Sequence, residues 1–325
     1  MRSGRAVGSP DERVDRSETE QGKRHPRGGP GKLFIVGIGP GNVAHLSARA
    51  TQALAEAQIV SGYRLYIDLI RPLLEGKRII QSAMTQEVDR VKAAIDAALD
   101  EDASVAIVSS GDPGIYAMAG LAFEICRNRN IRLLAAPSQR MAGVDPLQAE
   151  MNPGLPCLRI EVVPGIPALA SGASLLGAPL THDFACVSLS DLLTPWQQIE
   201  ARIEAAAKAD FVLVIYNPKS RKRADHLIRA QQILLQHRSP QTLVGIVQNA
   251  MREDECVRLT CLKDLHLAQV DMLTTVFVGN SRTFGYEGYM ITPRGYAEKY
   301  DMASPEGALE TDRMNGTTMA CTRSA

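Results

Sequence analysis

Three glycine-rich turns in the first half of the chain are the strongest candidates for chemistry. They are Gly37-Ile38-Gly39-Pro40-Gly41, Ser109-Ser110-Gly111-Asp112-Pro113-Gly114 and Val163-Pro164-Gly165-Ile166-Pro167-Ala168, and each follows an apolar run. Glycine lets a backbone approach a ligand closely, and open α/β sheets bind ligands at the carboxyl ends of their strands. The turns therefore predict a ligand cradle made largely of backbone.

Each turn also has a simpler interpretation. Asp112 could cap a following helix, with Pro113 in the first helical position. The small residues of 171–174 could serve close helix packing instead of binding. The first turn has the spacing GxGxG, and no acidic residue follows it at the expected distance of about 20 residues. Both features argue against a dinucleotide site.

Asparagines end three apolar runs of the second half, at Asn217, Asn249 and Asn280. Asparagine is favoured in turns, which explains each one alone, but together they could offer amide contacts to a polar ligand. Trp196 is the only tryptophan. It could pack in the core or line the pocket of a large, flat ligand.

The histidines and cysteines form no catalytic triad and no metal-binding pattern. Six histidines are scattered along the chain, and His182 and Asp183 should point in opposite directions in an extended stretch. None of the six cysteines forms a CxxC pair. We therefore expect no metal site, and single thiols in a reducing compartment.

Apolar runs alternate with helical patterns, which predicts an α/β fold with mostly parallel sheets. Strands are expected at 33–37, 104–110, 131–136, 158–163, 184–190, 211–216, 243–249, 256–260 and 272–279. Helices are expected at 46–57, 86–99, 114–126, 166–176, 196–208 and 221–236.

Composition divides the chain into two domains with flanking extensions. Residues 1–31 are charged and almost devoid of apolar side chains, so we expect a disordered extension there. An α/β domain at 32–180, carrying a polar insertion at 137–156, precedes a second α/β domain at 183–297. Residues 300–325 are expected to form a flexible tail.

Charge and hydropathy disfavour two classes of partner. Lys+Arg and Asp+Glu both number 36 in the 325 residues, and aromatic residues make up 5%. Zero net charge and few aromatic side chains argue against nucleic acid as a partner. There is no apolar run of about 18 residues and no apolar signal segment at the N-terminus, so we expect no membrane association and a cytoplasmic protein.

Taken together, these segments resemble the tetrapyrrole (class III) S-adenosylmethionine-dependent methyltransferases. The resemblance runs from about Gly31 to Tyr296 and is carried by the segments GIGPG, SSGDPGIYAMAG, EVVPGIPA and GAPLTHDF. Four further segments look like the branch that methylates carbon 17 of precorrin-3B: SLSDLLTPW, YNPKSRKR, VGIVQNAMRE and DMLTTVFVGNSRT.

The resemblance implies a fold, a cofactor and a reaction. S-adenosylmethionine would bind in a cleft between the two α/β domains of a homodimeric enzyme. Precorrin-3B would be methylated at C17 with contraction of the ring to precorrin-4, in cobalamin synthesis. Alternatives are cobalt-factor III as the substrate, or methylation at another ring carbon. A ribosomal RNA methylase is disfavoured by the zero net charge, and a tetrapyrrole carrier by the intact glycine turns.

Roles for individual residues follow from the resemblance. The expected cofactor contacts are Pro40, Ser110, Gly111, Asp112, Ile115, Pro167, Ala168, Tyr216, Asn217, Asn249, Ala250 and Thr275. The expected substrate contacts are Gly39, Gly41, Arg64, Trp196, Arg282 and Arg294, the arginines pairing with substrate carboxylates unless they are ordinary surface arginines. Asp191, His182 and Tyr63 are candidate acid–base groups for the ring contraction. Pro167 stands where the family usually has Thr or Ser, so a hydroxyl contact to the cofactor should be lost.

Overall fold

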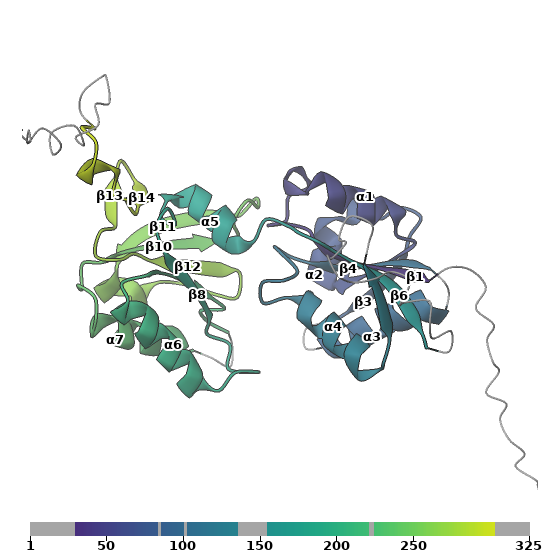
Figure 1. The fold of residues 1–325 in the computed structure, drawn as a ribbon. Coiled ribbons are helices and arrows are strands. Elements are labelled where there is room, and N and C mark those ends of the chain that lie inside the picture. The colour runs from purple at the N-terminus through teal and green to yellow at the C-terminus, as the bar shows by residue number, and fades with distance from the viewer. Residues whose placement is uncertain (1–29, 84–85, 101–102, 136–154, 221–223, 303–325) are drawn as a thin grey trace, which may run out of the picture.

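The structure, a computed structural model, describes residues 30–302 except 84–85, 101–102, 136–154 and 221–223. The extension expected at 1–31, the insertion expected at 137–156 and the tail expected at 300–325 lie almost wholly outside the described residues. Figure 1 shows the rest as two α/β halves. No described helix has both the length and the hydropathy needed to span a membrane.

The first half is a six-stranded sheet in which every pairing is parallel. Its strand order is β3-β2-β4-β1-β6-β5. The strands are β1 (Gly31–Gly37), β2 (Ile59–Tyr63), β3 (Arg78–Ser82), β4 (Ser104–Ser109), β5 (Arg132–Ala135) and β6 (Cys157–Val163). The expectation of a parallel sheet is confirmed for this half.

Helices cover both faces of this sheet, as Figure 1 shows. They are α1 (Ala48–Glu56), α2 (Arg64–Leu69), α3 (Glu87–Asp100) and α4 (Met118–Asn128). In β1, Leu33 and Ile35 pack with α3 and α4, whereas Phe34 and Val36 pack with α1 and α2. Burial on both faces explains why such strands are continuous apolar runs.

The second sheet is mixed, which corrects the expectation of mostly parallel sheets throughout. Its order is β11-β10-β12-β9-β8, and of its four pairings only β8 with β9 is parallel. The strands are β8 (Phe184–Ser188), β9 (Val212–Tyr216), β10 (Leu243–Gln248), β11 (Cys256–Cys261) and β12 (Thr274–Val278). A short turn joins β10 to β11, and such a turn permits only antiparallel pairing.

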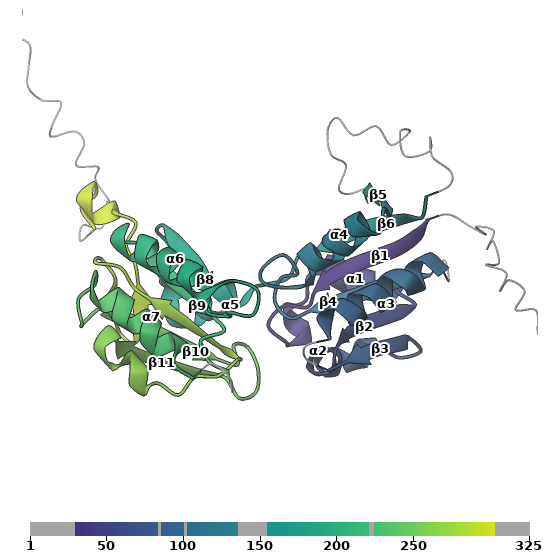
Figure 2. The same cartoon turned by 90° about the horizontal axis from the view of Figure 1, so that it is seen from below.

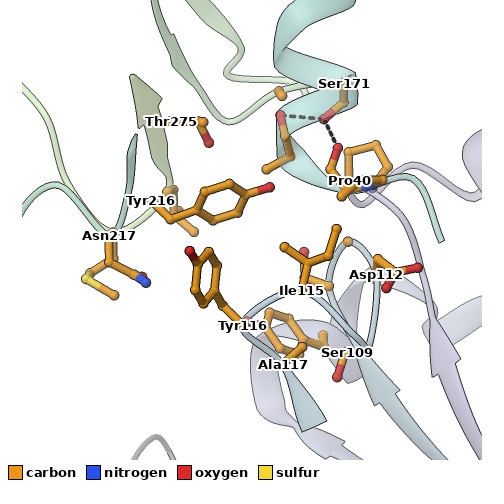
Figure 3. A pocket seen from close by; sticks show the side chains of 18 of the residues that line it. Pro40, Ser109, Asp112, Ile115, Tyr116, Ala117, Ser171, Tyr216, Asn217 and Thr275 are labelled. Atoms are coloured by element: carbon orange, nitrogen blue, oxygen red, sulfur yellow. Dashed lines mark hydrogen bonds between the residues drawn. The ribbon is translucent and has the colours of Figure 1, made fainter. Parts of the chain in front are cut away.

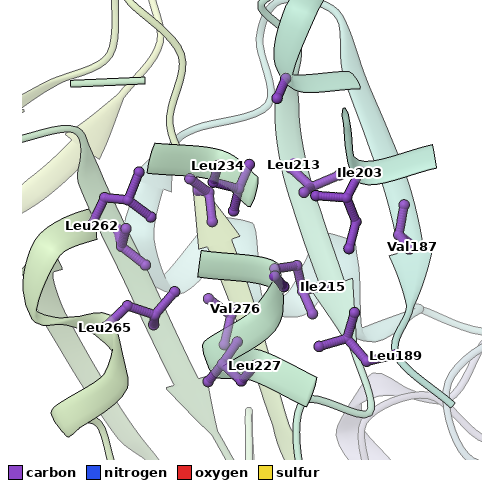
Figure 4. Packing of buried hydrophobic residues seen from close by; sticks show 14 of the residues in the cluster. Val187, Leu189, Ile203, Leu213, Ile215, Leu227, Leu234, Leu262, Leu265 and Val276 are labelled. Atoms are coloured by element: carbon purple, nitrogen blue, oxygen red, sulfur yellow. The ribbon is translucent and has the colours of Figure 1, made fainter. Parts of the chain in front are cut away.

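One face of the second sheet carries α6 (Trp196–Lys208), α7 (His226–Leu235) and the 3₁₀ turn Leu262–Leu267. Figure 4 shows their side chains meeting those of the strands, with Ile203, Leu234 and Leu262 among them. This core lies on one side of the sheet, so the other side is open to a further element.

Helix α5 (Ala168–Leu176) covers that other side. It follows the first sheet in the chain, yet Leu176 packs with Val214, Val247 and Phe277. Figures 1 and 2 show α5 in the half that holds β8 to β12. We expected this helix within the domain ending at 180. Its packing favours a boundary before it, at 164–167.

A small third sheet extends from the end of α5. Strand β7 (Gly177–Ala178) pairs with β14 (Tyr289–Ile291), which pairs with β13 (Phe284–Tyr286). This sheet was not predicted, because its strands are too short to show a periodic pattern.

The three glycine-rich turns meet at the carboxyl ends of the neighbouring strands β4, β1 and β6. Gly39 and Gly111 exchange backbone hydrogen bonds of 3.1 and 2.7 Å. A Cβ atom on Gly165 would lie 2.2 Å from the carbonyl oxygen of Gly111 and 2.7 Å from the carbonyl carbon of Gly37. Only glycine fits where three backbones approach this closely.

We predict that Gly165→Ala lowers the free energy of unfolding by at least about 1–3 kcal/mol, because the obstructing atoms are backbone and cannot rotate away. Gly120→Ala is the matched control. Gly120 is an exposed position in α4, and a Cβ added there would meet no atom within 4 Å, so alanine should raise stability by up to about 1 kcal/mol. Urea unfolding measures both, and equal effects of the two substitutions would contradict the prediction.

Candidate active site

A cavity of about 320 Å³ lies where the two halves face each other (Figure 3), a size typical of small-molecule sites. Its wall combines the first two glycine-rich turns, the start of α5, the ends of β9 and β10, and the start of β12. The cavity thus occupies the carboxyl ends of the parallel strands, where the sequence places its glycine-rich turns.

Every residue expected to contact the cofactor lies on this wall. The first half provides Pro40, Ser110, Gly111, Asp112 and Ile115, the start of α5 provides Pro167 and Ala168, and the second half provides Tyr216, Asn217, Asn249, Ala250 and Thr275. Their contact with a cofactor stays a prediction, but the structure brings them together from widely separated stretches of chain.

Asp112 joins two of the glycine-rich turns. One carboxylate oxygen accepts a hydrogen bond from the Gly114 N–H at 2.8 Å, and the other from the Gly165 N–H at 3.2 Å. The alternative interpretation of Asp112 as a helix cap is wrong, because α4 begins only at Met118. Tyr116 has φ = 52°, which no residue inside a helix adopts, so the chain becomes helical only beyond it.

Two tyrosines connect the halves at the cavity. The Tyr116 hydroxyl donates to the carbonyl oxygen of Cys186 at 3.0 Å, and its ring centroid lies 5.3 Å from that of Tyr216. The Tyr216 hydroxyl accepts from the Leu169 N–H at 2.8 Å, at the start of α5. Burial raises the pKa of Tyr116 to about 12 and raises that of Tyr216 as well. Both phenols therefore stay neutral and keep these hydrogen bonds near neutral pH.

The strand-end asparagines use their amide groups within the protein. Asn217 Nδ2 donates to Ser188 Oγ at 2.9 Å, and Asn249 Nδ2 donates to Asp254 Oδ2 at 2.8 Å. Both residues have positive φ, which asparagine tolerates well. Asn280 lies away from the cavity wall and accepts from the N–H of Arg282. The turn interpretation therefore holds for all three, and Asn217 and Asn249 also border the cavity.

Arg252 is a wall residue that the sequence did not single out. Its Nε donates to the Pro40 carbonyl oxygen at 2.7 Å, and its Nη2 reaches Ser110 Oγ at 3.4 Å. A Cβ on Gly41 would lie 2.8 Å from that Nε. Gly41 and Gly39, expected to contact substrate, are absent from the cavity wall. Gly41 instead leaves room for this side chain, which links the second half to the first turn.

The other expected substrate residues also lie outside the cavity wall. Trp196 is buried in the core of the second half and stacks on His226 with ring centroids 4.4 Å apart. Arg282 pairs with Glu298, and Arg294 donates to the Thr181 carbonyl oxygen. The core interpretation of Trp196 is confirmed, and both arginines lie at the surface.

Arg64 lies in a second, more open hollow beside the cavity, together with Tyr63 and Ser82. Its side chain is 78% exposed and 4.0 Å from Asp68. Tyr63 lines both hollows, so the two are neighbours.

Of the three candidate acid–base groups, the structure places only Tyr63 on the cavity wall. Asp191 Oδ2 lies 3.6 Å from His226 Nε2, beside the buried Trp196. His182 Nδ1 accepts from the Asp183 N–H at 2.8 Å and lies 3.6 Å from the Asp183 carboxylate. The expectation that His182 and Asp183 point apart is therefore wrong, because the ring folds back over its own backbone.

Two further features of the wall bear on ligand binding. Ser109 Oγ is buried, lines the cavity and has no hydrogen-bond partner. Tyr66 and Arg90 also line it. Nothing in the sequence marks Arg90, because an arginine in an amphipathic helix is ordinarily read as a surface residue.

Among the described residues, no group of three or more His, Cys, Asp or Glu side chains could hold a metal ion.

The fold and the cavity define a class of two-domain α/β protein with a cavity of small-molecule size between its halves. The family model described as Tetrapyrrole (Corrin/Porphyrin) Methylases matches residues 32–142 and 146–266, so the chain belongs to this family. The resemblance found in the sequence is thereby confirmed.

Relatives in this family agree with the match. The chain is 46% identical over 279 residues to the cobalt-factor III methyltransferase of Priestia megaterium, a match that covers 86% of this chain but only 48% of that protein. It is 43% identical over 264 residues to a probable cobalt-factor III C(17)-methyltransferase of Salmonella typhimurium, covering 81% of this chain and 99% of that one. A crystal structure of the methyltransferase CobJ superposes with a TM-score of 0.68 at 32% identity, covering 81% of this chain and all of that one.

S-adenosylhomocysteine is the expected ligand of this cavity, and we predict that Arg252→Gln weakens its binding roughly fivefold, because the hydrogen bond that holds Pro40 against the second half is lost. Arg258→Gln is the control: its guanidinium donates to the Gln269 carbonyl oxygen at an exposed site on β11. Isothermal titration calorimetry measures both. Identical affinities of the two variants would contradict a role for Arg252 at the cavity.

The tyrosine contact also predicts a pH dependence. A phenol whose pKa is raised by folding contributes stability that is complete below its ordinary pKa of about 10 and is lost as the pH rises toward about 12. Tyr116→Phe removes this titration, so its melting temperature should fall less steeply than that of the wild type above about pH 9. Tyr286→Phe, at an exposed position of β13, is the control. Equal slopes in all three proteins would refute the assignment.

Proposed function

We propose that this protein transfers the methyl group of S-adenosylmethionine to carbon 17 of cobalt-factor III. The observation that carries the proposal is the cavity at the carboxyl ends of β1 and β4, whose wall contains every motif residue expected to contact the cofactor. The relatives named for cobalt-factor III support the choice of substrate over precorrin-3B.

The residues present fit S-adenosylmethionine. Gly111 lies on the cavity wall beside Pro167 and Ala168, and its φ of 67° is a backbone conformation that favours glycine. Ser109 Oγ is an unused hydrogen-bonding group on the same wall. The apolar Ile115 and Ala250 line the cavity with Tyr216 and suit the less polar parts of the cofactor. When bound, S-adenosylmethionine supplies an electrophilic methyl group on its sulfonium.

The chain's own contribution to the transfer is alignment and exclusion of water. Asp112 fixes two of the glycine-rich turns relative to each other, and Tyr116 and Arg252 hold the second half against them. An electron-rich ring carbon needs no strong base to accept a methyl group. This agrees with a described wall that contains neither histidine nor cysteine.

Ring contraction belongs to the same proposal and requires proton transfer. Tyr63 is the one candidate acid–base group on the cavity wall, and it lies where the cavity meets the second hollow. We assign it this role in place of Asp191 and His182. The homodimer and the cytoplasmic location remain predictions alongside it.

Precorrin-3B is the second candidate substrate. The segments SLSDLLTPW and VGNSRT resemble the branch that methylates carbon 17, and this resemblance applies equally to the metal-free and to the cobalt-bearing substrate. Both substrates would present the same carbon to the same cavity.

The test is turnover by the purified full-length chain. S-adenosylmethionine with a labelled methyl group is incubated anaerobically with cobalt-factor III and, separately, with precorrin-3B, and the mass and absorbance of the pigment are followed. We expect one labelled methyl group on cobalt-factor III and a shifted spectrum. A methyl group gained only by precorrin-3B would establish the second candidate. Binding of S-adenosylhomocysteine without label on either pigment would refute both substrates.

A further inference from the structure

Arg90 is a charged side chain almost completely removed from solvent. It lies in the first turns of α3, is 5% exposed, and lines the cavity together with Tyr63 and Tyr66. Arginine is rarely buried to this degree without an acidic partner.

The hydrogen bonds of Arg90 leave part of its guanidinium unused. Nη1 donates to Ser82 Oγ at 2.6 Å and reaches the Ala83 carbonyl oxygen at 3.5 Å, while Nη2 lies 3.9 Å from the sulfur of Met118. Nε is buried and has no partner. A sulfur atom is a weak acceptor, so the side of the guanidinium formed by Nε and Nη2 has capacity for a better one.

Arg90 takes part in none of the ion pairs of 4.0 Å or less among the described residues. Glu87 lies on the same helix and on the same wall, and it acts on Arg90 through its charge. Burial lowers the pKa of Arg90, and the nearby Glu87 opposes that effect only in part. An arginine remains protonated even so, and its Nε is buried without a hydrogen-bond partner.

We propose that Arg90 binds a carboxylate side chain of the tetrapyrrole substrate through Nε and Nη2. The inference deepens the proposed function and rests on it. A guanidinium and a carboxylate form two parallel hydrogen bonds, which orient the bound group as well as attract it. This assigns to a buried residue the role expected of the surface residues Arg64, Arg282 and Arg294.

The position of Arg90 favours the tetrapyrrole over the carboxylate of the cofactor. Its Nη1 partner Ser82 lines the second hollow, so the guanidinium lies between the two hollows. A macrocycle larger than the cofactor would extend past Tyr63 from one hollow into the other. The cofactor residues instead cluster around Gly111, Pro167 and Tyr216, at the junction of the halves.

The test compares Arg90→Gln and Arg90→Lys with the control Arg129→Gln. Arg129 follows α4 and pairs with Asp96 of α3, and it lies outside both hollows. Three quantities are measured for each protein: the Kd of cobalt-factor III with S-adenosylhomocysteine present, the Kd of S-adenosylhomocysteine alone, and the melting temperature.

Arg90→Gln should weaken binding of cobalt-factor III by about tenfold to a hundredfold, and leave the affinity for S-adenosylhomocysteine within about twofold. Arg90→Lys should recover part of the loss, because it keeps the charge but not the planar pair of donors. If Arg90→Gln does not fold, the lysine variant carries the test, with weakening of about threefold or more expected.

Three results would overturn the inference. Unchanged affinity for cobalt-factor III would show that Arg90 only supports the end of β3. Equal loss of affinity for S-adenosylhomocysteine would assign the anion to the cofactor. A wild-type protein that binds neither cobalt-factor III nor precorrin-3B would refute the proposed function itself, a result distinguishable from the other two because it requires no variant.

Discussion

The structure depends on the close approach of three backbones at one edge of the first sheet. Gly37, Gly111 and Gly165 belong to different turns, and a Cβ on Gly37 would lie 2.6 Å from both the Gly111 carbonyl oxygen and the Gly165 nitrogen. Because the strands β4, β1 and β6 are neighbours and parallel, their turns must meet at the same edge. The glycines let them pack without side chains between them, and the Asp112 carboxylate then ties two of the turns together. The cavity wall is built on this contact.

The second half completes the cavity through a small number of polar contacts. Tyr116 reaches Cys186, Arg252 reaches Pro40, and Tyr216 holds the start of α5. Helix α5 packs on the second sheet but begins directly after the third glycine-rich turn of the first half. The packing of this helix and the continuous chain therefore both connect the two halves. We therefore expect the geometry of the cavity to respond to substitution of the residues that make these contacts. Arg252 is one of them: it lies in the recognised segment VGIVQNAMRE, but it was not expected to contact a ligand.

The charged residues show how far sequence reasoning extends. Arg282 and Arg294 attracted attention because they lie in recognisable segments near strand ends, yet they pair with Glu298 and Thr181 away from the cavity. Arg90 went unnoticed because the helical pattern of α3 gives an arginine no distinguishing position. Its burial arises from β3 and α4, whose Ser82 and Met118 cover it. Likewise Trp196 stands out in the sequence as the only tryptophan, but in the structure its ring stacks on that of His226.

The sequence by itself determined the α/β class, the parallel first sheet and the glycine-rich turns. Those features are local, because strand periodicity and strand-end turns lie in contiguous residues. The set of residues that line the cavity was implied by the resemblance of these segments to the tetrapyrrole methylases. Only the tertiary structure decided the mixed pairing of the second sheet, the association of α5 with it, and the exclusion of Asp191 and His182 from the cavity wall. Each of these depends on contacts between residues that are far apart in the chain. Local sequence patterns are compatible with several such arrangements, and burial and steric fit decide which one forms.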